Sequence, residues 1–151
     1  MTAEELAHEL HAGQVDQGGR PYVEHLADVA GILLRRWPDA PPFAIEAAWL
    51  HDALEDTATT PDTLLAAGVS PAAAAIVRRL TRPAGMTYRQ WIADLAASGD
   101  AWAICVKLAD NEHNCDPSRR RPGSDIVERR YVPARRVLEE ALAQCRTDIP
   151  F

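Results

Sequence analysis

Apolar residues recur every three or four positions along most of the chain, the spacing that places side chains on one face of an α-helix. One example lies between Pro21 and Pro38, two residues that can begin and stop a helix. Its apolar residues Leu26, Val29 and Leu33 share one face. No stretch alternates apolar and polar residues with the period of two that marks a half-buried strand. The pattern therefore predicts an all-α protein.

Prolines, glycines and capping residues divide this pattern into separate helices. Thr2, Thr60 and Thr87 stand where the first turn of a helix needs a side-chain acceptor for its free N–H groups. The expected helices cover about 2–13, 21–38, 42–56, 61–67, 71–82 and 124–145, and two more begin near 87 and 100. We therefore expect a helical bundle of about seven to eight helices, with residues 1–151 forming one domain.

Composition narrows the function classes. The chain has 151 residues, of which 47% are hydrophobic and 25% charged, and this is typical of a globular protein. The net charge of −6 gives no basic field for DNA or RNA, so we expect neither as a partner. The same charge would repel a polyanionic small molecule, so a phosphate substrate would need local cations.

The ends of the chain and its cysteines give no sign of export or of a membrane anchor. The first residues, MTAEELAHEL, lack the basic and apolar regions of a signal peptide, and apolar runs such as AAAAIV are too short to cross a bilayer. Cys105, Cys115 and Cys145 are odd in number and have no CxxC spacing. We expect a reduced cytoplasmic protein without a membrane partner, and a chain with no room for a further domain.

The stretch WLHDALEDT, residues 49–57, concentrates ionisable groups among apolar ones. At about 100° per residue, one side of the predicted helix carries four of these groups, namely His51, Asp52, Glu55 and Asp56. An ordinary solvated acidic face would have the same appearance.

Two distant stretches favour a site over a solvated face. PYVEHLADVA supplies His25 on a helix that is otherwise apolar, and VKLADNEHN supplies Asp110 directly after Leu108 and Ala109. A carboxylate in that position is costly unless it is paired or bound to metal. Each fragment alone is weak, since a lone histidine usually has a structural role. Together, three helices deliver imidazoles and carboxylates that suit a divalent ion such as Mn²⁺ or Fe²⁺ with open coordination positions.

These motifs resemble a known family. The spacing H-x13-H-x25-HD-x57-D, counted from His11, is similar to that of the HD-domain phosphohydrolases. HAGQ…GGRPYVEH, AAWLHDALEDT and VKLADNEHN resemble more closely the hydrolase region of RelA/SpoT enzymes and the small alarmone hydrolases, from about His8 to about Tyr131. The resemblance implies one Mn²⁺ ion with four protein ligands, namely His25, His51, Asp52 and Asp110.

The two acids that follow the HD pair have a place in this chemistry. Such an ion lowers the pKa of a bound water and offsets charge on the phosphate. Glu55 and Asp56 lie one turn beyond the ligands, where a base for the water or an acid for the leaving oxygen is needed. Residues 53–109 contain no histidine, which favours a single metal over the two-metal members of the wider superfamily.

Several residues are candidates for substrate contact. Lys107 is the only lysine in the chain; unless this is chance, it is a compact cation for a phosphate or an acidic neighbour. The resemblance suggests that Asn114 binds the ribose or a phosphate. Tyr22 could border the nucleotide or be a half-buried aromatic, and Tyr131 matches a tyrosine in a later helix of the family.

The loop after HAGQ departs from the family pattern. The family carries basic residues there, read as contacts to base and phosphate, whereas this chain has Val15, Asp16 and Gln17. Arg20 could compensate from the other side of the turn, as could the arginines at 78, 79, 82 and 119–121, unless they are solvated. The departure concerns the substrate and leaves the predicted metal site intact.

We therefore expect a metal-dependent nucleotide phosphohydrolase that removes the 3′-pyrophosphate of (p)ppGpp-type alarmones. A second hypothesis keeps the metal and assigns (p)ppApp or another phosphorylated nucleoside, because Asp16 replaces a cation. A third is a catalytically silent domain that binds a nucleotide. The resemblance implies a free-standing degrading enzyme with a small-molecule partner.

Overall fold

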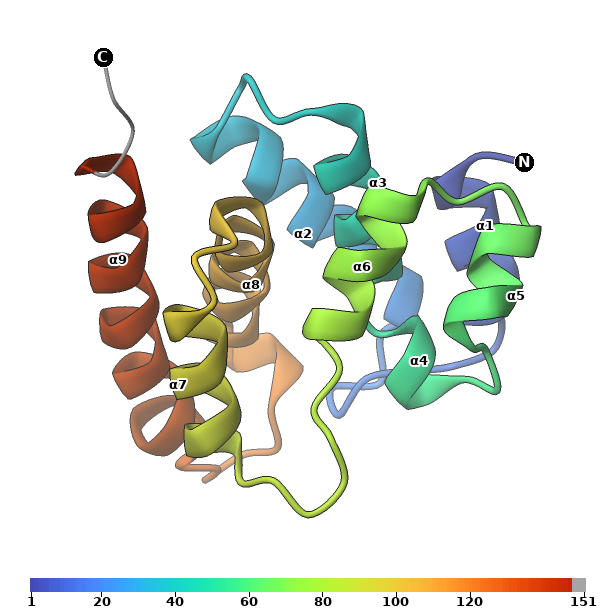
Figure 1. The fold of residues 1–151 in the computed structure, drawn as a ribbon. Helices are drawn as coiled ribbons and strands as arrows, with labels where there is room; N and C mark the ends of the chain where they lie inside the picture. Colours follow the sequence, from blue (N-terminus) through green and yellow to red (C-terminus); the bar gives the residue numbers. More distant parts are fainter. Residues whose placement is uncertain (148–151) are drawn as a thin grey trace.

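The computed structural model describes the backbone of residues 1–147 and the side chains of residues 1–145. These residues form α-helices joined by short loops and no strand, so the predicted all-α bundle is confirmed (Figure 1). The bounds are α1 (Ala3–Leu10), α2 (Tyr22–Arg36), α3 (Pro42–Leu50), α4 (Ala53–Asp56), α5 (Pro61–Ala66), α6 (Pro71–Arg79), α7 (Tyr88–Ala97), α8 (Ala101–Asn114) and α9 (Val132–Thr147). A 3-10 turn, η1 (Pro117–Arg119), and a π-helical turn, η2 (Val127–Tyr131), complete the set.

Helix starts fall where threonines can cap them. Thr2, Thr60 and Thr87 each accept a hydrogen bond from the backbone N–H three residues later, and that residue's side chain accepts one from the threonine N–H. This reciprocal arrangement satisfies two N–H groups that a helix start leaves without partners. The predicted starts of α1, α5 and α7 are confirmed.

Helix α8 lies at the centre of the bundle. It packs against α2 and α3 on one side and against α7 and α9 on the other (Figure 1). The inward faces are made of fully buried residues such as Leu26, Leu33 and Leu108, each worth roughly 1.5–3 kcal/mol on burial. Eleven of the fourteen residues of α8 are buried, so its polar side chains need partners inside the protein.

The predicted helix over 42–56 is divided in two, and the expectation of one continuous helix was wrong. α3 ends at Leu50, and His51 and Asp52 connect it to α4, with Asp52 at φ −100° and ψ 1°. In a continuous helix the Ala48 carbonyl would accept from the Asp52 N–H. Here it accepts a 2.7 Å hydrogen bond from Nδ1 of the His51 ring. This competing bond accompanies the interruption at the HD pair.

The last helix begins near Ser124, as predicted, but its first turn is π-helical. The Asp125 carbonyl accepts from the Arg129 N–H, and η2 runs directly into α9. Asn111 of α8 donates a 2.8 Å hydrogen bond to the Tyr131 carbonyl. A π-turn leaves carbonyls with altered partners, and this side chain satisfies one of them. The contact fixes η2 against the central helix.

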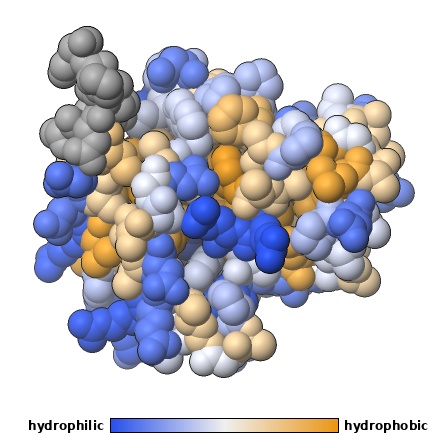
Figure 2. All heavy atoms as spheres, viewed as in Figure 1, coloured by the Kyte–Doolittle hydropathy of each residue, from blue (hydrophilic) through white to orange (hydrophobic). Residues whose placement is uncertain are grey.

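The surface mixes polar and apolar residues. Figure 2 shows them interspersed over the face seen in Figure 1, without one continuous apolar band. Among the described residues, no helix combines the length and the apolar character needed to cross a bilayer.

Candidate functional site

Four side chains from three separate parts of the fold converge at one point. His25 comes from α2, His51 and Asp52 from the junction of α3 and α4, and Asp110 from α8. His25, His51 and Asp52 each offer one potential ligand atom, and these three atoms lie within 4.8 Å of one another. Asp110 Oδ1 lies 3.0 Å from His25 Nε2 and 3.3 Å from His51 Nε2. The structure therefore brings together all four predicted ligands.

The spacing of these atoms fits a divalent ion. Ligands at about 2.1 Å from a cation and at right angles to each other are about 3.0 Å apart. Asp52 Oδ2 lies 3.1 Å from His51 Nε2, close to that separation, and 3.7 Å from His25 Nε2. Two imidazoles and two carboxylates, with no cysteine, suit a hard or borderline ion with open positions better than a closed structural zinc.

The tautomer of His51 also fits a metal ligand. Its Nδ1 faces the Ala48 carbonyl at 2.7 Å, and since a carbonyl can only accept, Nδ1 carries the proton. In the neutral ring Nε2 then has a free lone pair, which points at the convergence of carboxylates. With no ion bound, Asp52 and Asp110 outweigh the effect of burial and raise the pKa of His51 well above its ordinary value. A cation would take the place of that second proton.

His25 is oriented by a relay that the sequence analysis missed. His113 Nε2 lies 2.9 Å from Asp28 Oδ2, so it donates to that carboxylate and leaves His113 Nδ1 as an acceptor. His25 Nδ1 lies 2.8 Å from His113 Nδ1 and donates to it. His25 Nε2 therefore presents its lone pair to the site, as outer partners do for metal-bound histidines. Burial lowers the pKa of His25 to about 4, so the ring is neutral.

The two carboxylates are held ionised by their neighbours. Burial would raise the pKa of Asp52, but the adjacent His51 outweighs this and lowers it. Tyr22 donates a 2.6 Å hydrogen bond from its hydroxyl to Asp52 Oδ2. Burial likewise opposes ionisation of Asp110, but the Lys107 and His51 charges and the hydrogen bonds from His25 and His51 together outweigh it and lower the pKa. Both groups are therefore anionic, the form that a metal ligand requires.

Lys107 points at an acid inside the protein. Its Nζ lies 2.7 Å from Asp110 Oδ2 and 4.7 Å from the centre of the Trp91 ring. Burial would lower the pKa of Lys107, but Asp110 outweighs it and raises the pKa. Of the two roles expected for this lysine, the structure shows the pairing with an acidic neighbour, while its place in the pocket lining also allows contact with a phosphate.

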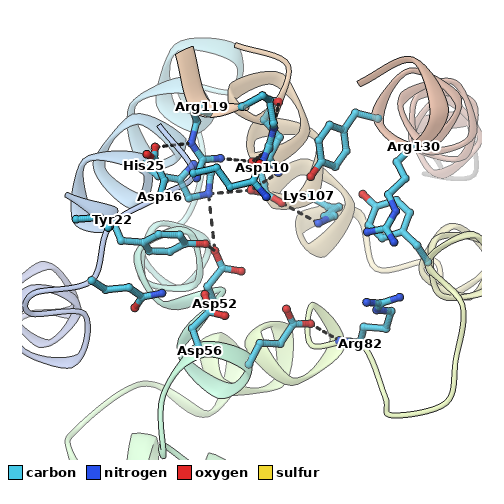
Figure 3. A pocket seen from close by; sticks show the side chains of 18 of the residues that line it. Asp16, Tyr22, His25, Asp52, Asp56, Arg82, Lys107, Asp110, Arg119 and Arg130 are labelled. Atoms are coloured by element: carbon cyan, nitrogen blue, oxygen red, sulfur yellow. Dashed lines mark hydrogen bonds and ion pairs between the residues drawn. The ribbon is translucent and has the colours of Figure 1, made fainter. Parts of the chain in front are cut away.

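A pocket of about 330 Å³ opens directly beside the four ligands. Tyr22, Asp52 and Asp56 lie on one side of it, and Lys107, Arg82 and Arg130 lie on the other (Figure 3). Acidic groups therefore flank the candidate metal position while cations occupy the opposite wall. The protein has a net charge of −6, which disfavours a phosphate. The cationic wall supplies the local positive charge that a phosphate in the pocket needs.

Glu55 and Asp56 both line the pocket, as the helical phase predicted, although the helix is interrupted before them. Glu55 Oε1 accepts a 2.7 Å hydrogen bond from the Arg82 backbone N–H, which ties α4 to the segment after α6. Burial, followed by the nearby Asp52 and Glu55 charges, raises the pKa of Asp56. A carboxylate with increased proton affinity is better suited to accept a proton than an ordinary aspartate.

Some of the predicted substrate-contact residues line the pocket, and one of them does not. Tyr22, Asn114 and Tyr131 all line the pocket. The Asn114 side chain is engaged within the protein, because its Nδ2 donates to Asp110 Oδ1 at 3.0 Å. Arg20 is not among the lining residues; its Nε lies 3.1 Å from Glu24 Oε2 in an ion pair at the surface.

Three further arginines line the pocket: Arg119 and Arg120, which the sequence offered only as possible compensating cations, and Arg130, which it did not single out. The first two come from the polar loop after α8, and the third comes from η2. The only signal in the sequence was the run of arginines in SRRRPG and ERRY, a composition that solvated surface shares. Their approach to α8 depends on tertiary contacts.

Comparison with known proteins places these features in a family. The family model described as an HD domain matches residues 3–121. A guanosine-3′,5′-bis(diphosphate) 3′-pyrophosphohydrolase of Haemophilus influenzae is 32% identical over 119 residues, covering 72% of this chain and 17% of that protein. The bifunctional (p)ppGpp synthase/hydrolase SpoT of Escherichia coli K12 is 32% identical over 144 residues, covering 89% of this chain and 19% of that protein. The chain spans about a fifth of the length of these relatives.

A solved structure supports the fold. It is described as a metazoan ortholog of SpoT that hydrolyzes ppGpp, and it superposes with a TM-score of 0.75 over 96% of this chain and 92% of that chain. At 21% sequence identity this likeness concerns the fold. The resemblance drawn from the motifs is confirmed: the chain belongs to the HD domain family.

Proposed function

We propose that this protein is a divalent-metal-dependent phosphohydrolase that removes the 3′-pyrophosphate of (p)ppGpp. The observation that carries the proposal is the convergence of His25, His51, Asp52 and Asp110 beside a pocket with one acidic and one cationic wall. The names of the relatives, which include 3′-pyrophosphohydrolases of guanosine-3′,5′-bis(diphosphate), support the choice of substrate.

We assign the metal as one Mn²⁺ ion. Oxygen and imidazole nitrogen donors suit this ion, and the two histidine rings present neutral Nε2 atoms through the Ala48 and His113 contacts. When bound, such an ion lowers the pKa of a water and offsets charge on the reacting phosphate.

The protein's own groups handle the proton and the remaining charge. Asp56, whose pKa is raised by burial and then by the Asp52 and Glu55 charges, accepts the proton of the attacking water. Lys107 remains protonated and lies against Asp110, where its charge can offset charge that develops on the phosphate. Tyr22 keeps its proton, because burial raises its pKa, and orients Asp52 through the 2.6 Å hydrogen bond.

The hypothesis of an adenine substrate rested on Asp16 as a substituted cation. In the structure both oxygens of Asp16 are engaged: Oδ1 accepts from the backbone N–H groups of Gly18 and Arg20, and Oδ2 pairs with Arg119. These bonds account for Asp16 within the protein, and the names of the relatives favour guanosine alarmones as the proposed substrate.

The test is an assay of purified protein with Mn²⁺ and a panel of guanosine and adenosine nucleotides, with release of pyrophosphate measured. We expect pyrophosphate and a guanosine nucleotide from ppGpp and pppGpp, and loss of activity in Asp52→Ala. Asp62→Asn, an exposed acid outside the pocket, is the matched control. Absence of release from every nucleotide, or full activity in Asp52→Ala, would reject the proposal; tight nucleotide binding without turnover would point to the silent binding domain.

A further inference from the structure

Two loops that are distant in sequence meet at the rim of the pocket. The loop 14–20 precedes α2 and the loop 116–123 follows α8. Gly18 packs so closely on the second loop that a Cβ there would overlap the carbonyl oxygen of Ser118. Asp16 Oδ2 lies 3.4 Å from Arg119 Nε, and both side chains are about 5% exposed or less. The contact is therefore a tight, buried junction.

The junction holds the guanidinium of Arg119 from two directions. Asp16 fixes its Nε, and the Asn114 side-chain oxygen accepts from its Nη1. Asp16 can do so because its other oxygen is fixed by the backbone N–H groups of Gly18 and Arg20, at 2.9 and 3.0 Å. These two anchors do not use the second terminal nitrogen of Arg119, and the residue lines the pocket.

A second guanidinium converges on the same amide. Arg120 donates from Nη2 to Asn114 Oδ1 at 3.0 Å and from Nε to the Asn114 carbonyl at 3.2 Å. Two positive charges thus meet at one oxygen, and Asp16 is their only carboxylate partner within the described residues. Like charges gathered in this way repel each other unless an anion lies near them. Asn114 in turn donates to Asp110, so this charge lies two hydrogen bonds from the candidate metal position.

We propose that Arg119 and Arg120 form a phosphate-binding subsite, and that Asp16 is a positioning residue that holds Arg119 for this contact. The inference rests on the proposed function for the identity of the substrate. The subsite binds a phosphate group of the nucleotide next to the reacting one. Asp16 does not remove a cation from the pocket: it fixes one that a distant loop supplies.

If the Asp16–Arg119 ion pair had only a structural role, substitutions would change the stability of the loops. They would leave ligand affinity unchanged in any variant that folds, whereas loss of a binding subsite would lower it. Arg120 separates the two explanations, because within the described residues it has no carboxylate partner to lose. Asp116 offers a matched control for Asp16: it caps η1 through its own side chain, accepting from the Ser118 N–H at 2.9 Å, and it does not line the pocket.

The experiment measures binding of inorganic pyrophosphate by calorimetry in metal-free buffer, and then KM and kcat for ppGpp with Mn²⁺. The variants are Arg120→Gln, Arg119→Gln, Asp16→Asn and the control Asp116→Asn, each checked for folding by thermal melting. Loss of a charge-assisted contact should weaken pyrophosphate binding by about tenfold or more in the two arginine variants. Asp16→Asn should raise KM by about threefold with kcat within about twofold, and Asp116→Asn should change neither.

The outcomes separate the two proposals. Wild-type protein that binds pyrophosphate but hydrolyses no nucleotide would reject the proposed function and leave the subsite standing. Unchanged pyrophosphate affinity in folded Arg120→Gln, or an equal effect of Asp16→Asn and Asp116→Asn, would overturn the subsite. Should Arg119→Gln fail to fold, the half-buried Arg120 still decides the question.

Discussion

The two halves of the site are built in different ways. The candidate metal ligands lie on the inner faces of α2 and α8 and at the end of α3, among fully buried residues such as Leu26, Leu50 and Leu108. The far half, the pocket rim, is made by the loops 14–20 and 116–123 and by η2. The first half is positioned by the core and the second by polar contacts between loops.

This difference decides what each half tolerates. Moving a ligand requires repacking of helices that bury many apolar side chains, so the core holds its geometry firmly. A rim residue such as Arg119 depends on a few hydrogen bonds and one ion pair, each worth about 0.5–3 kcal/mol. The metal half should therefore give large effects on activity, and the rim smaller effects on substrate affinity.

The largest effect is expected from Asp110→Asn. Asp110 Oδ1 lies within 3.3 Å of both histidine Nε2 atoms, and its Oδ2 pairs with the buried Lys107. If the bound metal stabilises the transition state less by about 4 kcal/mol in this variant, kcat should fall on the order of 1,000-fold. The unpaired Lys107 should also lower the free energy of unfolding by roughly 3–5 kcal/mol. Activity and thermal melts test this against Asp94→Asn, an exposed acid of α7.

A smaller effect is expected one contact further out, at His113. His113→Leu removes the acceptor that fixes the His25 tautomer, so Mn²⁺ affinity should fall by about 10–100-fold. His113→Asn, whose oxygen can take the place of Nδ1, should retain more of the affinity. Metal titration by calorimetry measures both, with the exposed His8→Leu as control. Equal affinities for Mn²⁺ in all four proteins would show that the relay from Asp28 does not orient His25.

A substitution at Asn111 tests the rim, because this side chain bonds to η2 and to Arg135 of α9. Its amide donates to the Tyr131 carbonyl and accepts from Arg135, and so holds η2, the turn that carries Arg130 of the pocket lining. Asn111→Leu should lower the free energy of unfolding by about 1–3 kcal/mol and raise KM several-fold. Mn²⁺ affinity should stay unchanged, and a large loss of it would mean that the two halves are not separate.

The same division explains what the sequence could predict. His25 and Asp110 lie on helices whose phase is fixed by apolar spacing, whereas His51 and Asp52 follow the end of α3. The motif spacing that resembles the HD-domain family implied that all four belong to one ligand set. The interruption at His51 was missed because apolar spacing carries no sign of the contact between the His51 ring and the Ala48 carbonyl that accompanies it.

The rim depends on information that spacing does not carry. His113 lies three residues after Asp110 on α8, so helical phase could have placed it near α2, but nothing in the pattern paired it with His25. Asp16 and Arg119 are more than 100 residues apart, and only the folded loops show that the acid and the cation belong together. Comparison with the basic residues that the family carries in this loop indicated only that Asp16 replaces a cation.

The smallest effect is expected from the pH dependence of stability at Asp16. Burial would raise the pKa of Asp16, but the hydrogen bonds from the Arg20 and Gly18 amides and the Arg119 charge lower it below 3.8. A carboxyl whose pKa is lower in the folded state stabilises the fold above its unfolded pKa of about 3.9 and loses this contribution as the pH falls through the folded value.

Asp16→Asn keeps the oxygen that accepts from the Gly18 and Arg20 amides and removes the charge that pairs with Arg119. The difference in free energy of unfolding between wild type and variant should therefore be constant above about pH 4 and shrink below it. Other carboxylates titrate in both proteins, so the difference isolates Asp16. Denaturant unfolding at several pH values measures it. A difference that stays constant into strong acid would show that the junction depends on shape, as at Gly18, and the ion pair would then be incidental to how the rim is held.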